Sequence, residues 1–254
     1  MSMQVVAGVD GLWPELGPSF LVVGVFDGMH LGHAYLLEHL VAESKARAAR
    51  PTVITFDHHP DEILMGRAPA LLLDPDERLE RLEAAGVEVT VVQHFDAALR
   101  ETPYDVFVER IRARVALTGF LMTPEAAFGF ERRGTPGALA DLGRRDGFEV
   151  VIVPPFTVDG QEVRSSAIRT AIVRGDLATA ARLLGRPVTI TGSTDGPVDG
   201  LARLDFTLPV ALPPDGDYQV TVDGDPLTLR LIRGDAYLHG EPPNRRVTVV
   251  LGGT

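Results

Sequence analysis

The apolar positions near the N-terminus alternate between strand-like and helix-like spacing. Phe20 to Val23 form a continuous apolar run, which is typical of a strand covered on both faces. Apolar residues then recur at helical spacing between Leu36 and Val41, and Pro51 is expected to stop that segment. A second buried strand is predicted from Thr52 to Phe56. Together these segments predict one βαβ unit.

The same alternation continues to about residue 187. Asp74 is placed to cap a helix that has Pro75 in its first turn and Gly86 at its end. A further helix is expected to open at Thr102-Pro103. Further strands are predicted over 87–92, 115–122 and 149–153. A chain that alternates in this way forms an α/β fold, here a Rossmann-like, doubly wound and mostly parallel sheet.

The pattern changes after Pro187. Short β-type runs, separated by turns rich in Pro, Gly and Asp, occupy 188–192, 218–222, 227–232 and 247–251. No helix-length pattern interrupts them. The expected organisation is therefore an α/β domain over residues 1–187 and a small all-β domain over 188–254.

Composition narrows the choice of partners. The 254 residues carry a net charge of -11 and have no Lys/Arg run, so nucleic acid is not expected to bind. The longest apolar runs are of strand length, so no membrane association is expected, and a cytoplasmic enzyme is the default interpretation. The absence of cysteine excludes disulfides and cysteinyl metal sites.

The segment Gly24 to His33 carries the first candidate chemistry. A strand, a glycine-containing turn and a helix point backbone N–H groups and a helix dipole at a phosphate. His30 and His33, three residues apart, can share one face of the first helical turn, and Gly32 allows a triphosphate to approach closely. No third ligand accompanies the histidine pair, so we predict no metal ligands from the protein.

A second motif, Arg164-Ser165-Ser166-Ala167-Ile168-Arg169, precedes an amphipathic helix. Ser165 or Ser166 is expected to cap that helix. Because a helix dipole disfavours a cation near the N-terminus, Arg169 is expected to face a bound phosphate. The two motifs suit nucleotidyl transfer to a phosphate, which needs alignment and charge stabilisation but no general base. Two imidazole donors and a Mg²⁺ ion held mainly by the phosphates of the nucleotide would be sufficient.

These motifs resemble the His-x-Gly-His nucleotidyltransferase superfamily, and in particular the adenylyltransferase module of the prokaryotic FAD synthetases (riboflavin kinase/FMN adenylyltransferase). Residues 24–33 look like the family's Gly-Asn-Phe-Asp-Gly-Val-His-Leu-Gly-His, with Val25 in place of Asn. Residues 55–60 look like Thr-Phe-Asp-Pro-His-Pro, and 164–169 are similar to Ser-Ser-Thr-x-Ile-Arg. Residues 175–187 match the segment that leads into the kinase module. Four ordered blocks make the resemblance specific.

The resemblance implies a role for each block. Catalytic contacts to the triphosphate would come from His30, His33 and Arg169. The nucleotide pocket would be shaped by Gly24, Val25, Phe26, Asp27, Gly28, Gly32, Ser165 and Ser166. The acceptor, FMN, would be bordered by Phe56, Asp57, His59, Pro60, Glu125 and Phe128, although a turn with buried aromatics explains this last set equally well. The substrates would be ATP, as its Mg²⁺ complex, and FMN, and the product FAD.

Two departures from the family pattern affect these expectations. In place of the flavin-side block Gly-x-Asp/Asn-Phe-x-Phe-Gly, this chain has Thr123 to Gly129. Glu125 stands where the family has the shorter Asp or Asn, and Ala126 stands where the family has an aromatic residue. The kinase signature Gly-Phe-Pro-Thr-Ala-Asn is replaced by Leu204 to Val210, Glu241 lies in an unrelated turn, and the tail is short for a kinase barrel. The β domain is therefore expected to be a degenerate, kinase-like remnant without riboflavin kinase activity.

Three hypotheses follow from the sequence. The leading one is an FMN adenylyltransferase that makes FAD and pyrophosphate. A nucleotidyltransferase with another phosphorylated acceptor is favoured by Glu125 and Ala126. A non-catalytic flavin- or nucleotide-binding protein is the third, against which His30, His33 and Arg169 argue.

Overall fold

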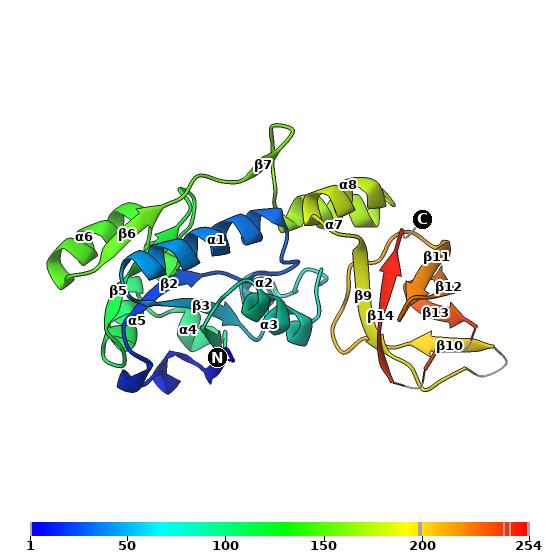
Figure 1. Ribbon diagram of the computed structural model, residues 1–254, viewed down its shortest axis with the longest axis horizontal. Helices are drawn as coiled ribbons and strands as arrows, with labels where there is room; N and C mark the ends of the chain where they lie inside the picture. The colour runs from blue at the N-terminus through cyan, green and yellow to red at the C-terminus, as the bar shows by residue number, and fades with distance from the viewer. Residues whose placement is uncertain (1, 198–199, 241, 244, 253–254) are drawn as a thin grey trace. The chain divides into compact units, whose positions relative to one another are not determined.

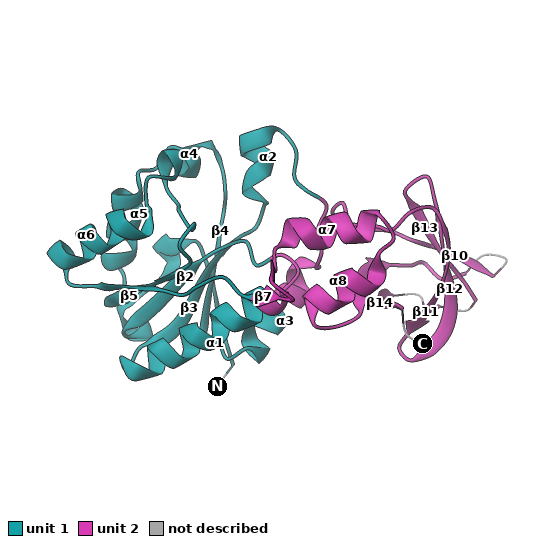
Figure 2. Cartoon of the chain, turned by 90° about the horizontal axis from the view of Figure 1, so that it is seen from above, with its two compact units in different colours: residues 1–26, 32–69, 79–156 teal, residues 27–31, 70–78, 157–254 magenta. Residues whose placement is uncertain are grey.

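A computed structural model describes residues 2–197, 200–240, 242–243 and 245–252 (Figure 1). The chain folds into two compact units, each built from segments that are separate in sequence (Figure 2). The first unit comprises residues 1–26, 32–69 and 79–156, and the second comprises residues 27–31, 70–78 and 157–254. The predicted domain boundary after residue 187 falls directly before a strand of the second unit.

The first unit is built on a parallel sheet, as predicted, and the sheet has six strands. Its strands are β1 (Gln4–Ala7), β2 (Ser19–Val23), β3 (Arg50–Phe56), β4 (Val89–Gln93), β5 (Leu117–Met122) and β6 (Glu149–Ile152). Their order is β1-β4-β3-β2-β5-β6. From β2 the chain adds β3 and β4 on one side of the sheet and then returns to add β5 and β6 on the other side. In such a sheet, ligands bind outside the carboxyl ends of the strands at this reversal, between β2 and β5.

Helices connect these strands. They are α1 (Leu31–Ala46), α2 (Pro60–Met65), α3 (Pro75–Ala84), α4 (Ala97–Arg100), α5 (Tyr104–Arg112) and α6 (Pro136–Asp146), with 3₁₀ turns at Val9–Gly11, Pro14–Leu16 and Phe130–Arg132. Asp74 caps α3 as predicted, because its Oδ1 accepts the N–H of Asp76 at 2.8 Å. The core joins sheet and helices through residues such as Leu21, Ile54, Phe107 and Phe120.

The second unit contains α7 (Ser165–Val173), α8 (Leu177–Leu184) and a β module. A small ribbon is formed by β7 (Thr157–Val158) and β8 (Gln161–Glu162). The antiparallel sheet of the module contains β9 (Val188–Ser193), β10 (Leu201–Leu204), β11 (Gly216–Val222), β12 (Asp225–Ile232), β13 (Asp235–His239) and β14 (Arg246–Leu251), in the order β10-β13-β12-β11-β14-β9. This confirms the predicted all-β character.

Residues 70–78 belong to the second unit because they are bonded to its β module. The N–H of Leu71 donates to Pro209 O at 2.8 Å, and the N–H of Ala211 donates to Leu71 O at 2.8 Å. Arg246 of β14 forms ion pairs with Asp74 and Asp76. The β module therefore contacts this segment both at Leu71 and at Asp74 and Asp76. Among the described residues, no helix is both long and apolar enough to cross a membrane.

Candidate nucleotide site

The turn that follows β2 is fixed to the neighbouring strand β3. The N–H of Gly24 donates to Ile54 O at 3.0 Å, and the carbonyl of Val25 accepts the hydroxyl of Thr55 at 3.0 Å. Phe26 is buried and has a left-handed φ of 55°, which is uncommon for a bulky residue. Its ring lies 5.0 Å from that of His33, the third residue of α1. The backbone is therefore strained within the predicted nucleotide motif. Strained backbone of this kind is often found at functional sites.

Gly28 continues this turn within the second unit. Its φ is 89°, and a Cβ added there would lie 2.9 Å from the Cδ1 of Leu72. Glycine is therefore required by both the backbone conformation and the packing. The close approach places residues 27–31 against segment 70–78.

Asp27 is the centre of the polar contacts in this unit. Its side chain is 3% exposed, and its Oδ2 pairs with Arg169 Nη2 at 2.6 Å. Its Oδ1 accepts the N–H of Leu72 at 2.9 Å. The carbonyl of Asp27 accepts the hydroxyl of Ser165 at 2.8 Å. These contacts connect the turn, segment 70–78 and the start of α7.

The prediction that Ser165 or Ser166 caps α7 is wrong. The N-cap residue is Arg164, which makes no side-chain capping bond, and Ser165 is the first helical residue. Ser166 is the second helical residue, and its carbonyl accepts the hydroxyl of Thr170. The hydroxyl of Ser165 is used by Asp27 instead of the helix terminus, because a tertiary acceptor lies within reach.

Arg169 is the fifth of the nine residues of α7, beyond the first turn in which it was expected, and it is paired with an anion of the protein. Besides its pair with Asp27, its Nε donates to Ala70 O at 2.8 Å. The helix dipole falls off within the first turn and the carboxylate of Asp27 already balances the charge, so the position of Arg169 alone does not require a bound phosphate. The contacts instead fix the direction of the guanidinium.

His30 is 4% exposed and directly precedes α1. Burial, together with the positive charges of Arg186 and Arg169, lowers the pKa of His30 to about 4. The imidazole is consequently neutral at pH 7 in an electropositive environment. Arg186 also donates from Nη2 to Gly28 O at 2.9 Å. Sequence reasoning had not selected Arg186, although it lies in the matched block 175–187.

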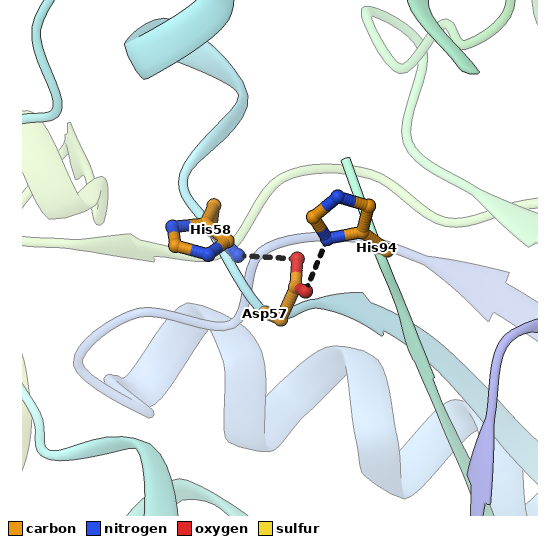
Figure 3. Close-up of side chains that lie close together, drawn as sticks. All are labelled: Asp57, His58 and His94. Carbon is orange, nitrogen blue, oxygen red and sulfur yellow. Dashed lines mark hydrogen bonds and ion pairs between the residues drawn. The ribbon is translucent and has the colours of Figure 1, made fainter. Parts of the chain in front are cut away.

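The predicted acceptor residues follow two strands of the first unit. Phe56 ends β3, and its ring meets that of Phe95 edge-on at 5.4 Å. His59 caps α2 by accepting the N–H of Asp61 at 3.2 Å, and Pro60 is the first residue of that helix. Asp57 lies between them and accepts a 2.6 Å hydrogen bond from His94 (Figure 3).

Glu125 and Phe128 come after β5. Arg132 donates to the carbonyl of Glu125 at 3.1 Å. The Phe128 ring packs against Phe107 and Phe120, at 5.8 Å and 5.7 Å, next to the hydrophobic core. Because β3, β2 and β5 are adjacent and parallel, the loops after all three strands emerge at the same edge of the sheet. Gly24, Phe56 and Glu125 therefore share that edge.

The doubly wound sheet and the His-x-Gly-His turn after β2 define a nucleotidyltransferase-like α/β fold. The model of the FAD synthetase family matches residues 14–167. The chain is 35% identical over 192 residues to a bifunctional riboflavin kinase/FMN adenylyltransferase of Haemophilus influenzae, and 32% identical over 198 residues to one of Escherichia coli K12. This chain belongs to the FAD synthetase family.

Each of these two alignments covers 75% of this chain and 62% of the relative, so the chain spans less than two thirds of the curated relatives it matches. A solved structure titled as a macrolide-efflux protein from Streptococcus pneumoniae has the same fold. It superposes with a TM-score of 0.82 at 21% identity, and the match covers 98% of this chain and 89% of that one.

Proposed function

We propose that this chain transfers AMP from ATP to FMN, giving FAD and pyrophosphate. Membership of the FAD synthetase family supports the reaction class. The observation that carries the proposal is the buried, neutral His30 beside two guanidinium groups, at the turn between β2 and α1. Such a site favours binding of a polyanion, and it supplies N–H donors to charge that develops on phosphate oxygens.

In the proposed reaction, a phosphate oxygen of FMN attacks the α-phosphorus of ATP. A new P–O–P linkage forms, the bond between the α-phosphorus and its bridging oxygen breaks, and pyrophosphate leaves. The attacking oxygen is already an anion, so no side chain has to remove a proton. His30 and His33 are proposed to donate hydrogen bonds to the phosphates, with Gly32 permitting close approach. Arg186 adds positive charge.

Ser165 and Ser166 are proposed to act at the phosphates through their backbone N–H groups in the first turn of α7, and Arg169 is proposed to act there from the second turn. Asp27 holds the direction of the Arg169 guanidinium through the 2.6 Å ion pair. The Asp27 carboxylate is already used by Arg169 and the N–H of Leu72. We therefore propose that Mg²⁺ enters as part of the ATP substrate, held by its phosphates.

The acceptor is proposed to be FMN, bordered by the loops after β3 and β5. The replacement of an aromatic by Ala126 favours a second candidate, another phosphorylated acceptor. Phe128 supports the second candidate further, since its ring packs beside the core. The two candidates differ only in the acceptor.

The β module is proposed to lack riboflavin kinase activity. The curated relatives are bifunctional by name. In this chain, Leu204 to Val210 replaces the kinase signature. Glu241, the glutamate considered for a catalytic role, lies outside the described residues.

Incubation with ATP, Mg²⁺ and FMN tests the proposal, with FAD measured by chromatography. We expect FAD formation, and we expect His33→Ala to lower turnover by about two to three orders of magnitude through loss of a donor to the transition state. His39→Ala, in the same helix, is the matched control and should retain turnover. Binding of ATP without FAD formation would exclude FMN as acceptor. A full rate in His33→Ala would remove that residue from the mechanism.

A further inference from the structure

Three metal-ligating side chains converge in the first unit, apart from the His30 turn. Asp57 follows β3, His94 follows β4, and His58 is next to Asp57 in the chain (Figure 3). One potential ligand atom from each lies within 4.8 Å of the others. Within the residues that the structure describes, this is the one such group of three. The side chains are 34%, 46% and 63% exposed for Asp57, His58 and His94, so an ion can reach them from solvent.

The parallel pairing of β3 and β4 brings the group together. Phe56 is in register with Gln93, and the N–H of Asp57 extends the ladder by donating to Gln93 O at 3.2 Å. Asp57 and His94 are therefore side by side at the carboxyl edge. Figure 3 shows the imidazoles of His58 and His94 on either side of the carboxylate.

Hydrogen bonds orient two of the three side chains, Asp57 and His58. The Oδ1 of Asp57 accepts the N–H groups of His58 at 2.7 Å and Phe95 at 3.2 Å, which leaves Oδ2 facing His94. The Nδ1 of His58 contacts Glu62 Oε2 at 3.2 Å, which orients its imidazole. A carboxylate that holds the second nitrogen of a ligating histidine is the usual outer partner in metal sites.

The spacing fits a small divalent cation. Metal–nitrogen and metal–oxygen bonds of about 2.0–2.2 Å place tetrahedral ligand atoms about 3.3 Å apart. The Asp57–His94 contact of 2.6 Å would have to open by less than about 1 Å, and the wider separations would have to close by about 1.5 Å. Exposed side chains can make such changes by small rotations.

We propose that Asp57, His58 and His94 bind a first-row transition-metal ion of the Zn²⁺ type. Two imidazoles and one carboxylate are the donors that this class of ion prefers, whereas Mg²⁺ and Ca²⁺ prefer oxygen donors alone. Three protein ligands leave at least one coordination position for water or an anion. Asp57 and His58 lie in the loop after β3 that is proposed to border the acceptor, but binding of the ion needs no bound nucleotide.

Titration of the untagged full chain with Co²⁺ tests this site, after treatment with a chelator and without ATP or Mg²⁺. We expect one equivalent of Co²⁺ to bind with visible absorption typical of nitrogen and oxygen ligands, and Zn²⁺ to displace it. His58→Gln and His94→Gln should each weaken binding by at least about tenfold. Asp57→Asn should do the same. His39→Gln removes an imidazole elsewhere and should leave binding unchanged.

The proposal is overturned if the parent chain binds no stoichiometric Co²⁺ or Zn²⁺, or if the double variant of His58 and His94 binds as the parent does. Thermal unfolding of each variant without metal verifies that it is folded. FAD formation is not the readout, so failure of this site and failure of the proposed transferase activity are distinguishable.

Discussion

His30 is held in its neutral form by its own surroundings. Burial is the larger cause, and the positive charges of Arg186 and Arg169 act in the same direction. A neutral imidazole has one N–H donor and one acceptor nitrogen. With a pKa of about 4, His30 keeps this neutral form between pH 6 and pH 8 in the unliganded chain.

The same shift predicts how stability depends on pH. The pKa of His30 is about 4 in the folded chain against 6.5 in its ordinary state. Between these values the unfolded chain binds more protons, so His30 contributes stability that is present above pH 6.5 and is lost as pH falls towards 4. The contribution is about 3 kcal/mol in total. Urea unfolding at pH 7 and pH 4.5 measures it.

His30→Gln should remove this part of the pH dependence, because glutamine does not titrate. His39→Gln should leave the dependence as it is in the parent chain. An identical loss of stability on acidification in the parent and in His30→Gln would show that other groups account for it.

Residue patterns selected one part of the candidate site and did not select another. His30, His33 and Arg169 were selected because their types and spacing suit phosphate chemistry. Arg186 and the central role of Asp27 were missed, because they depend on contacts between residues far apart in sequence, such as the 142 positions between Asp27 and Arg169. Asp57 was selected only by family resemblance, and His94 not at all. The shared position of both residues directly after neighbouring strands was the available signal.

At the scale of elements, the turn from β2 into α1 depends on one glycine. Gly28→Ala is expected to lower the free energy of unfolding by about 1–3 kcal/mol, because a left-handed backbone and a contact of 2.9 Å with Leu72 both disfavour a Cβ. Denaturant midpoints measure the change. Gly137→Ala in α6 is the matched control, since a Cβ there meets nothing within 4 Å, and it should not destabilise the chain. Equal midpoints for the parent and Gly28→Ala would contradict the packing argument.

The connection between that turn and α7 depends on a buried ion pair. Asp27→Asn removes the charge opposite Arg169, which is 18% exposed, and the uncompensated cation should cost about 3–5 kcal/mol of stability. Asp205→Asn breaks a pair with Arg203 in which both side chains are about 60% exposed, so its effect should stay below about 1 kcal/mol. Chemical unfolding of both variants provides the comparison. Similar losses in both would refute the importance of burial.

Long periodic elements were predictable and short ones were not. The strands β2 and β3 and the helix α1 followed from apolar runs and helical spacing. The strand β1 was missed because three of its four residues are exposed, so its sequence shows no buried face. The helix α2 has six residues and buries none of them, and β10 and β13 have four and five residues. Tertiary pairing, more than local pattern, determines elements of this size.

At the scale of the whole molecule, the proposed loss of the kinase reaction can be measured directly. Riboflavin, ATP and Mg²⁺ should give no FMN, because the kinase signature is replaced by Leu204 to Val210. In the same preparation, FMN and ATP should still give FAD. Chromatography distinguishes the two flavin products. Formation of FMN from riboflavin would show that another set of residues in the β module performs the phosphorylation.

Segment 70–78 limits where the chain can be divided to make a fragment or a chimera. Its carbonyl at Ala70 and its N–H at Leu72 hold Arg169 and Asp27, while Leu71 and Asp74 are held by the β module. A fragment or chimera divided after residue 187 would keep every motif residue of the nucleotide site and lose the strands that brace this segment. The geometry of the proposed nucleotide site therefore depends on β9–β14 as well as on the motif residues themselves.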